Sequence, residues 1–93
     1  MPLGDRLKQL RTTAELSVRE AAKLIGKSPG YLSRVETRGE IPAPELIIAI
    51  AEAYEADAEE LLREAKEDYM ERVEQEIDSK QERALAVFRK EKR

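Results

Sequence analysis

The strongest constraint in this sequence is a pair of helix starts with a single glycine between them. Ser17 and Glu20 form a capping box, in which the Ser17 hydroxyl accepts from the Glu20 amide and the Glu20 side chain returns to the Ser17 amide. Gly26 ends that helix because glycine adopts the left-handed backbone without a steric penalty. Ser28, followed by Pro29 at the first helical position, begins the next helix. The sequence therefore predicts two short helices joined by a very tight turn.

These two helices, predicted at residues 17–25 and 28–36, must cross at a steep angle. A glycine-containing turn of three or four residues joins helices at about 90–120°. Ala22 is small enough to let the two backbones approach, and Leu32 and Val35 supply the inner face of the second helix. Residue types in this order indicate a helix-turn-helix, whose second helix suits the major groove of DNA.

Helical patterns also cover the rest of the chain. Leucines spaced by three and four residues form an apolar stripe on a predicted helix at 3–14. Pro44 begins another helix after a turn-rich loop, and a capping-type start at Asp57 opens a helix that meets neither Gly nor Pro through Arg93. Since no segment alternates convincingly as a strand does, the predicted fold class is all-α.

Composition excludes several classes of function. The 93 residues include no Cys and no His, which removes disulfides, the usual zinc sites and the common Ser-His and Cys-His nucleophile pairs. We therefore expect no enzyme activity, with no catalytic residue, no metal and no cofactor. No run approaches the roughly 18 apolar residues of a membrane helix, and no signal peptide opens the chain. We expect a cytoplasmic protein without a membrane segment.

The formal net charge of −3 averages two unlike halves. Residues 1–41 carry eight Lys and Arg against five acidic residues, whereas residues 42–93 carry nine against fifteen. Such asymmetry indicates a basic working face joined to an acidic part with a different role. A helical protein that is charged only for solubility is the alternative, and charge alone leaves it open.

Residues 16–36, LSVREAAKLIGKSPGYLSRVE, resemble the helix-turn-helix of the Cro/C1 phage-repressor family, also called the xenobiotic-response-element type. The resemblance extends from residue 3 to residue 63 and implies the compact five-helix fold of that family. We thus expect a DNA-binding domain at residues 1–63 and a C-terminal helical extension at residues 64–93. The resemblance further implies a bacterial or phage-encoded protein whose partner is double-stranded DNA.

The resemblance and the chemistry of DNA assign candidate contacts. Pro29 and Gly30 stand where relatives often carry long polar side chains, so base contacts must come from other positions of the same helix. The expected base contacts are Ser28, Tyr31, Ser33 and Arg34. Arg34 is the strongest of them, because a guanidinium can bond O6 and N7 of guanine together. Helix starts attract anions, and the expected phosphate contacts are Ser17, Val18, Arg19, Lys27 and Arg38.

Arg11 and Glu36 match positions that pair in members of the family, where they link the first helix to the end of the third. The resemblance therefore implies a structural pair. The loop after Glu36 departs from the family pattern. Relatives place a glycine one residue earlier, whereas here Thr37 and Arg38 precede Gly39.

The C-terminal third carries an apolar stripe that needs a partner. Its heptad positions are 70, 73, 77, 84 and 87, with a polar Lys80 where an apolar residue is expected. The expected dimer or partner contacts are Tyr69, Met70, Val73 and Ile77. Either a second subunit or the chain folding back after Ser79 would bury this stripe. Dimerisation suits two-fold symmetric operators.

The predicted function is that of a sequence-specific regulator of transcription, acting as a homodimeric repressor on a pseudo-palindromic operator. Phosphate contacts would supply much of the affinity and the recognition helix the selectivity. Two alternatives stay open: an antitoxin whose helix-turn-helix binds DNA and whose tail binds a toxin, and a helical interaction adaptor that does not bind DNA.

Overall fold

The computed structural model describes residues 1–91, with side chains through residue 89. Within that range the chain forms five α-helices and no strand, as predicted. They are α1 (Leu3–Thr13), α2 (Val18–Leu24), α3 (Pro29–Thr37), α4 (Pro44–Ala53) and α5 (Ala58–Glu91). None of these helices has both the length and the apolarity needed to cross a bilayer.

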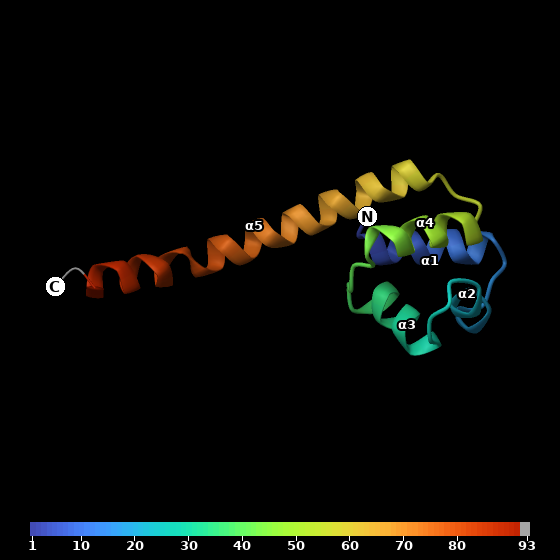
Figure 1. The fold of residues 1–93 in the computed structure, drawn as a ribbon, viewed down its shortest axis with the longest axis horizontal. Helices are drawn as coiled ribbons and strands as arrows, with labels where there is room; N and C mark the ends of the chain where they lie inside the picture. The colour runs from blue at the N-terminus through green and yellow to red at the C-terminus, as the bar shows by residue number, and fades with distance from the viewer. Residues whose placement is uncertain (92–93) are drawn as a thin grey trace.

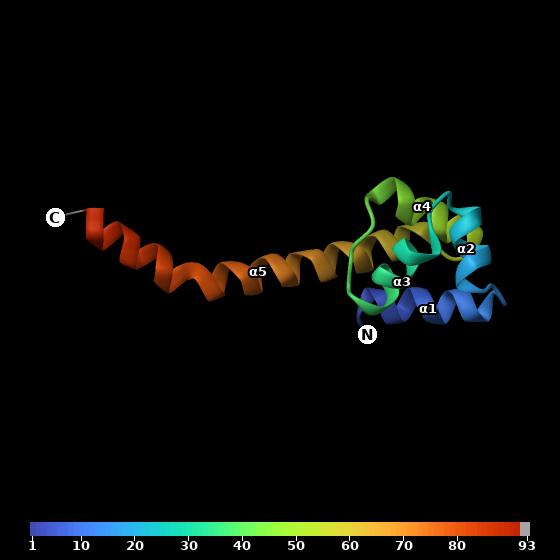
Figure 2. The same ribbon diagram turned by 90° about the horizontal axis from the view of Figure 1, so that it is seen from below.

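The molecule has a compact end and a projecting end (Figure 1). Helices α1 to α4 and the beginning of α5 pack together, while the remainder of α5 extends away from them alone in both views (Figure 2). The described chain consequently measures 61 × 25 × 21 Å along its principal axes.

The hydrophobic core lies where all five helices meet, with α5 contributing only its first turns. Leu7, Leu32 and Ile50 are completely buried there, and Ile47 and Leu61 nearly so. Because each such side chain contributes about 1.5–3 kcal/mol on burial, this core accounts for the stability of the compact end.

Helix α1 crosses the end of α3 with almost no space between their backbones. A Cβ atom at Gly4 would lie 2.6 Å from the carbonyl oxygen of Val35 and 2.7 Å from that of Glu36. Both neighbours are backbone atoms, which cannot move aside as a flexible side chain can. Only glycine fits at this crossing, although nothing in the local sequence marks the position.

The predicted alternative in which the chain folds back after Ser79 is wrong for the described residues. Helix α5 continues without interruption to Glu91. Residues 79–83 interrupt the apolar stripe, but they contain no Gly or Pro that would break the backbone. The helix also passes residue 63 without a break, and Ala65 is buried in the core. The expected division between residues 63 and 64 therefore coincides with no helix end.

Candidate nucleic-acid interface

The start of α2 is held by the predicted capping box. The Glu20 amide donates to Ser17 Oγ at 3.0 Å, and the Ser17 amide donates to Glu20 Oε1 at 3.1 Å. The bonds from Ser17, first from its backbone and then from its side chain, lower the pKa of the Glu20 carboxyl. Helix α3 starts in a similar way, since the Tyr31 amide donates to Ser28 Oγ at 3.1 Å.

The turn between α2 and α3 depends on Gly26. Its φ is +70°, the left-handed backbone that glycine adopts without penalty. The amide of Lys27 donates to the carbonyl of Ala22 at 2.9 Å, and the amide of Gly26 donates to that of Lys23 at 3.2 Å. This pair of bonds is a Schellman motif, and it reverses the chain directly into the start of α3.

Helix α3 has one buried and one exposed face. Leu32 and Val35 lie in the core, whereas Ser28, Ser33 and Arg34 are exposed. Tyr31 is partly buried and packs against the edge of the core. The structure thus places all four expected base contacts on α3 or its N-cap, and three of them are open to solvent.

Two cations lie close to the Tyr31 ring. Lys27 Nζ is 5.3 Å and Arg34 Cζ is 5.7 Å from the centre of the ring, both within the range of cation–π attraction. Burial of the ring, and to a lesser degree the charge of Glu40, raises the pKa of the Tyr31 hydroxyl. Tyr31 therefore stays a neutral phenol at physiological pH and holds two basic side chains on the exposed face of α3.

Arg34 is also held from the loop after α3. Its Nε donates to Glu40 Oε2 at 3.0 Å, and the two side chains keep 49% and 43% of their exposure. Its Nη1 lies 3.9 Å from the position that a Cβ would take at Gly30. The missing side chain at residue 30 consequently leaves open space beside this guanidinium.

The expected phosphate contacts lie at both ends of this unit. Ser17 and Arg19 are exposed at the start of α2, Lys27 in the turn, and Arg38 at the end of α3. Val18 differs because its side chain packs against the core. Only its backbone amide, in the first turn of α2, faces the region where an anion would bind.

Comparisons with known proteins agree with this geometry. The model of a helix-turn-helix domain family matches residues 2–65. The chain belongs to this family. A crystal structure of ClgR, the clp gene regulator of Corynebacterium glutamicum, is 33% identical, with a TM-score of 0.59 over 69% of this chain and 83% of that one. A second crystal structure of ClgR is 29% identical, with a TM-score of 0.61 over 84% and 83% of the two chains. The curated proteins include no match.

A buried ion pair between Arg11 of α1 and Glu36 of α3 links the helix-turn-helix to α1. Arg11 Nε and Nη2 donate to the two carboxylate oxygens of Glu36, at 2.7 Å and 3.0 Å, and Arg11 Nη1 donates to the Leu16 carbonyl at 2.8 Å. The two side chains keep only 8% and 3% of their exposure. Hydrogen bonding to Glu36 is the main cause of the raised pKa of Arg11. The structure thus brings together the two residues expected to pair, in the last turn of α3.

Sequence reasoning missed the partner of Arg34. Glu40 follows α3 in an irregular loop, where no periodic pattern indicates which side chains meet. Among the described residues, no group of three or more acidic side chains lies close enough together to hold a metal ion. The chemistry of the helix-turn-helix surface is that of hydroxyl, amide, phenol and cationic groups, which are the groups that bind phosphates and base edges.

Proposed function

We propose that this chain is a homodimeric repressor that binds a pseudo-palindromic operator through α2 and α3. Its family and its likeness to ClgR make it a DNA-binding transcription regulator. The observation that carries the proposal is the exposed face of α3, where Ser28, Ser33 and Arg34 stand opposite the buried Leu32 and Val35. A helix fixed by its apolar face can present the other face to a groove without rearrangement.

Arg34 is the residue proposed to read a base. Its ion pair with Glu40 is exposed, and exposed pairs contribute only about 0–1 kcal/mol. A bidentate contact with guanine discriminates by about 1–3 kcal/mol. The contact with guanine is therefore worth more than the ion pair, so Arg34 can release Glu40 and bind guanine at low cost.

The remaining contacts have supporting roles. We assign Ser28, Tyr31 and Ser33 to base edges in the major groove. We assign the phosphate contacts to positions at helix starts and in flanking turns, namely Ser17, Val18, Arg19, Lys27 and Arg38. Contacts of this second kind fix the position of the protein on the duplex and weaken as salt concentration rises.

Repression follows from occupancy of a promoter by two copies. We propose that residues 1–63 bind DNA and residues 64–93 carry the dimer contacts, among them Tyr69, Met70, Val73 and Ile77. Joining two half-site contacts raises the effective affinity without a new base contact. We assign the protein to the cytoplasm and assign it no catalytic activity.

The test is a pair of substitutions on duplexes enriched by the protein from a random-sequence pool. Arg34→Ala is expected to weaken binding by about 1–3 kcal/mol and to relax preference at one base pair, whereas Lys27→Ala weakens all duplexes alike and lowers the salt dependence. Arg63→Ala removes the same charge from the exposed surface of α5 and serves as the control. Unchanged discrimination by Arg34→Ala would refute the base contact, and absence of salt-dependent binding would favour the adaptor.

A further inference from the structure

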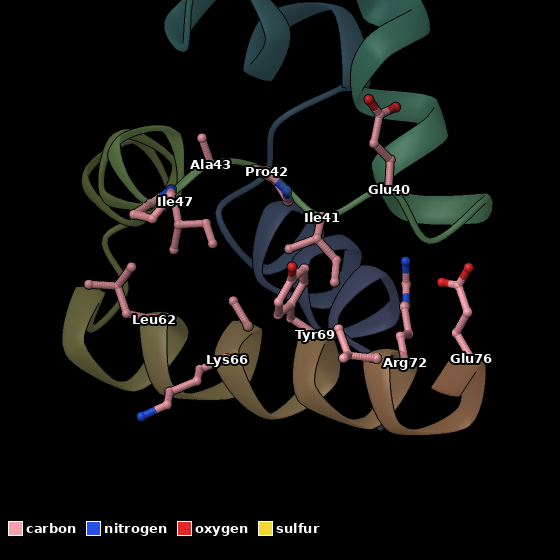
Figure 3. A pocket seen from close by; sticks show the side chains of 13 residues that line it. Glu40, Ile41, Pro42, Ala43, Ile47, Leu62, Lys66, Tyr69, Arg72 and Glu76 are labelled. Carbon is pink, nitrogen blue, oxygen red and sulfur yellow. The ribbon is translucent and has the colours of Figure 1, made fainter. Parts of the chain in front are cut away.

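An apolar groove of about 800 Å³ opens beside the loop that joins α3 to α4. Ile41, Pro42 and Ile47 line one side, and Leu62 and Tyr69 of α5 line the other (Figure 3). Pro42 and Ile47 are buried, but the Tyr69 side of the groove is open, since that residue is 56% exposed. The compact end of the molecule therefore offers apolar surface along α5 that its own helices do not cover.

The groove continues into the apolar stripe of the projecting helix. Val73 lines the end of the groove, and Ile77, Ala84 and Val87 follow at heptad spacing along the same side of α5. Ile77 is 61% exposed and Val87 is 52% exposed. Groove and stripe together make one surface that extends for about 35 Å, at 1.5 Å of rise per residue.

Local interactions do too little to stabilise this projecting helix in water. Ion pairs on its surface join Arg72 to Asp68 at 3.4 Å and Lys80 to Glu76 at 3.2 Å, both at i,i+4 spacing. Such pairs contribute about 0.3–0.5 kcal/mol each. Isolated helices are marginal in water, and most helical stability in proteins comes from packing of an apolar face. The stripe therefore requires a covering surface.

The charges of α5 specify what that surface is. Residues 66–78 contain six acidic and two basic residues, a net charge of −4. Residues 79–91, the rest of α5, contain four basic and two acidic residues, a net charge of +2. Two parallel copies would place like charge beside like charge, whereas two antiparallel copies place each acidic segment against a basic one. A second copy of this helix, in the antiparallel direction, thus complements α5 in both charge and apolar pattern.

We infer that the groove receives the C-terminal half of α5 from a second copy and that the two α5 helices pair antiparallel. This inference rests on the proposed homodimer and specifies its geometry. The stripes interdigitate when Met70 lies opposite Val87 of the second copy and Val73 lies opposite Ala84 of the second copy. The two-fold axis then passes near residue 78.

The same register explains the polar residue in the stripe. Lys80 falls next to the two-fold axis, opposite Ile77 of the second copy, where its aliphatic stem can cover apolar surface while the ammonium reaches water. The flanking Glu76 lies beside Arg83 of the second copy. In a parallel pair Glu76 would instead face Gln81, so the contact between residues 76 and 83 is specific to the antiparallel direction.

The absence of Cys from the sequence permits a direct test with spin labels on the full chain. Ser79→Cys and Arg89→Cys place a label on the side of α5 away from the stripe, near the axis and near the helix end respectively. In the antiparallel pair the residues at 79 stay level while those at 89 lie about 30 Å apart along the helices. We expect a label distance at residue 89 that exceeds the one at residue 79 by about 15 Å or more.

Each other outcome overturns the inference. Equal distances at the two positions mean a parallel pair, and a dimer in sedimentation without a measurable label distance means that the interface lies elsewhere. A monomer removes the pairing altogether. Glu76→Arg and Arg83→Glu supply a second readout, because each alone is expected to weaken self-association several-fold and the two together to restore it. Binding of an enriched duplex by the same labelled proteins keeps a failure of pairing distinguishable from a failure of DNA recognition.

Discussion

The two ends of this molecule are built from similar residues but are stabilised differently. In the described chain, every buried apolar side chain lies at or before Ala65, and beyond it only Asp68 and Val73 among the residues of α5 are even partly buried. The compact end is stabilised by tertiary burial, whereas the projecting end has helix propensity and surface charge. Helix formation and stability are therefore separate properties along one chain.

Charge shows the same contrast. At the compact end Arg11 and Glu36 are buried together in a bidentate pair, because neither charge alone would be tolerated there. Along α5 beyond the core, Arg72 and Asp68 form a pair whose side chains keep 47% and 21% of their exposure, so water still reaches both. Two ion pairs between an arginine and a carboxylate thus contribute differently to stability, because one is buried and the other is reached by water.

The largest expected effect tests this contrast directly. Arg11→Ala or Glu36→Ala is expected to lower the free energy of unfolding by about 3–5 kcal/mol, because either change leaves a buried charge unpaired. Arg72→Ala, the matched change at the projecting end, is expected to cost less than about 1 kcal/mol. Urea unfolding measures all three. The double change at 11 and 36 must cost less than the sum of the single changes, and additive losses would contradict the coupling.

Two isoleucines give a second matched pair. Ile47→Ala opens a cavity in the core and is expected to cost about 2–5 kcal/mol in urea unfolding. Ile77→Ala removes an exposed side chain and is expected to change the unfolding of the compact end by less than about 0.5 kcal/mol. Ile77→Ala is instead expected to weaken self-association, which sedimentation measures. A large loss of stability from Ile77→Ala in a monomeric sample would contradict the separation of the two ends.

Tyr54 supplies a test within the core. Its hydroxyl is buried and finds no hydrogen-bond partner among the described residues. Tyr54→Phe is therefore expected to raise the free energy of unfolding by about 1 kcal/mol, since it removes an unsatisfied polar group. Tyr69→Phe, at an exposed ring of α5, is the control and is expected to leave the stability of the compact end unchanged.

The raised pKa of Tyr54 leads us to expect a loss of stability at alkaline pH. Burial, with a further contribution from the charge of Glu36, raises the pKa of Tyr54 from 10.0 to about 12. The folded state thus favours the neutral phenol, and the stability that this provides is complete below pH 10 and is lost between pH 10 and about 12. Thermal unfolding across this range should show a decline that is smaller in Tyr54→Phe. Equal declines in the two proteins would contradict the assignment.

The smallest effect on the compact end is expected from removing the projecting end. Ala65 is buried and Glu64 pairs with Arg6 at 3.5 Å, so a truncation belongs after Glu67. The shortened chain is expected to unfold with a free energy within about 0.5 kcal/mol of the full chain when both are monomeric. Sedimentation should show that it no longer self-associates. A truncated chain that still dimerises would move the interface to the compact end.

Much of the recognition unit could be predicted because its signals are local. The capping box at Ser17, the stop at Gly26 and the cap at Ser28 each involve residues within five positions of one another, and local geometry decides such bonds. The chain reversals after α1 and α4 escaped prediction because Glu15 and Glu55 take a positive φ, at 60° and 54°, where glycine is expected. Backbone bonds of the same pattern as those around Gly26 hold these residues there, since the amides of Leu16 and Ala56 donate to the carbonyls of Arg11 and Ala51, although no glycine marks either turn.

The sequence by itself determined that the chain is helical, where α2 and α3 begin, and which face of α3 is apolar, because spacing along one helix encodes each of these properties. Only the tertiary structure decided that Gly4 is needed at the crossing of α1 and α3, that Glu40 holds Arg34, and that α5 continues alone beyond the core. These features depend on segments that are distant in sequence or irregular in backbone. Helical periodicity carries no information about such contacts, since it describes one element and not the surface that meets it.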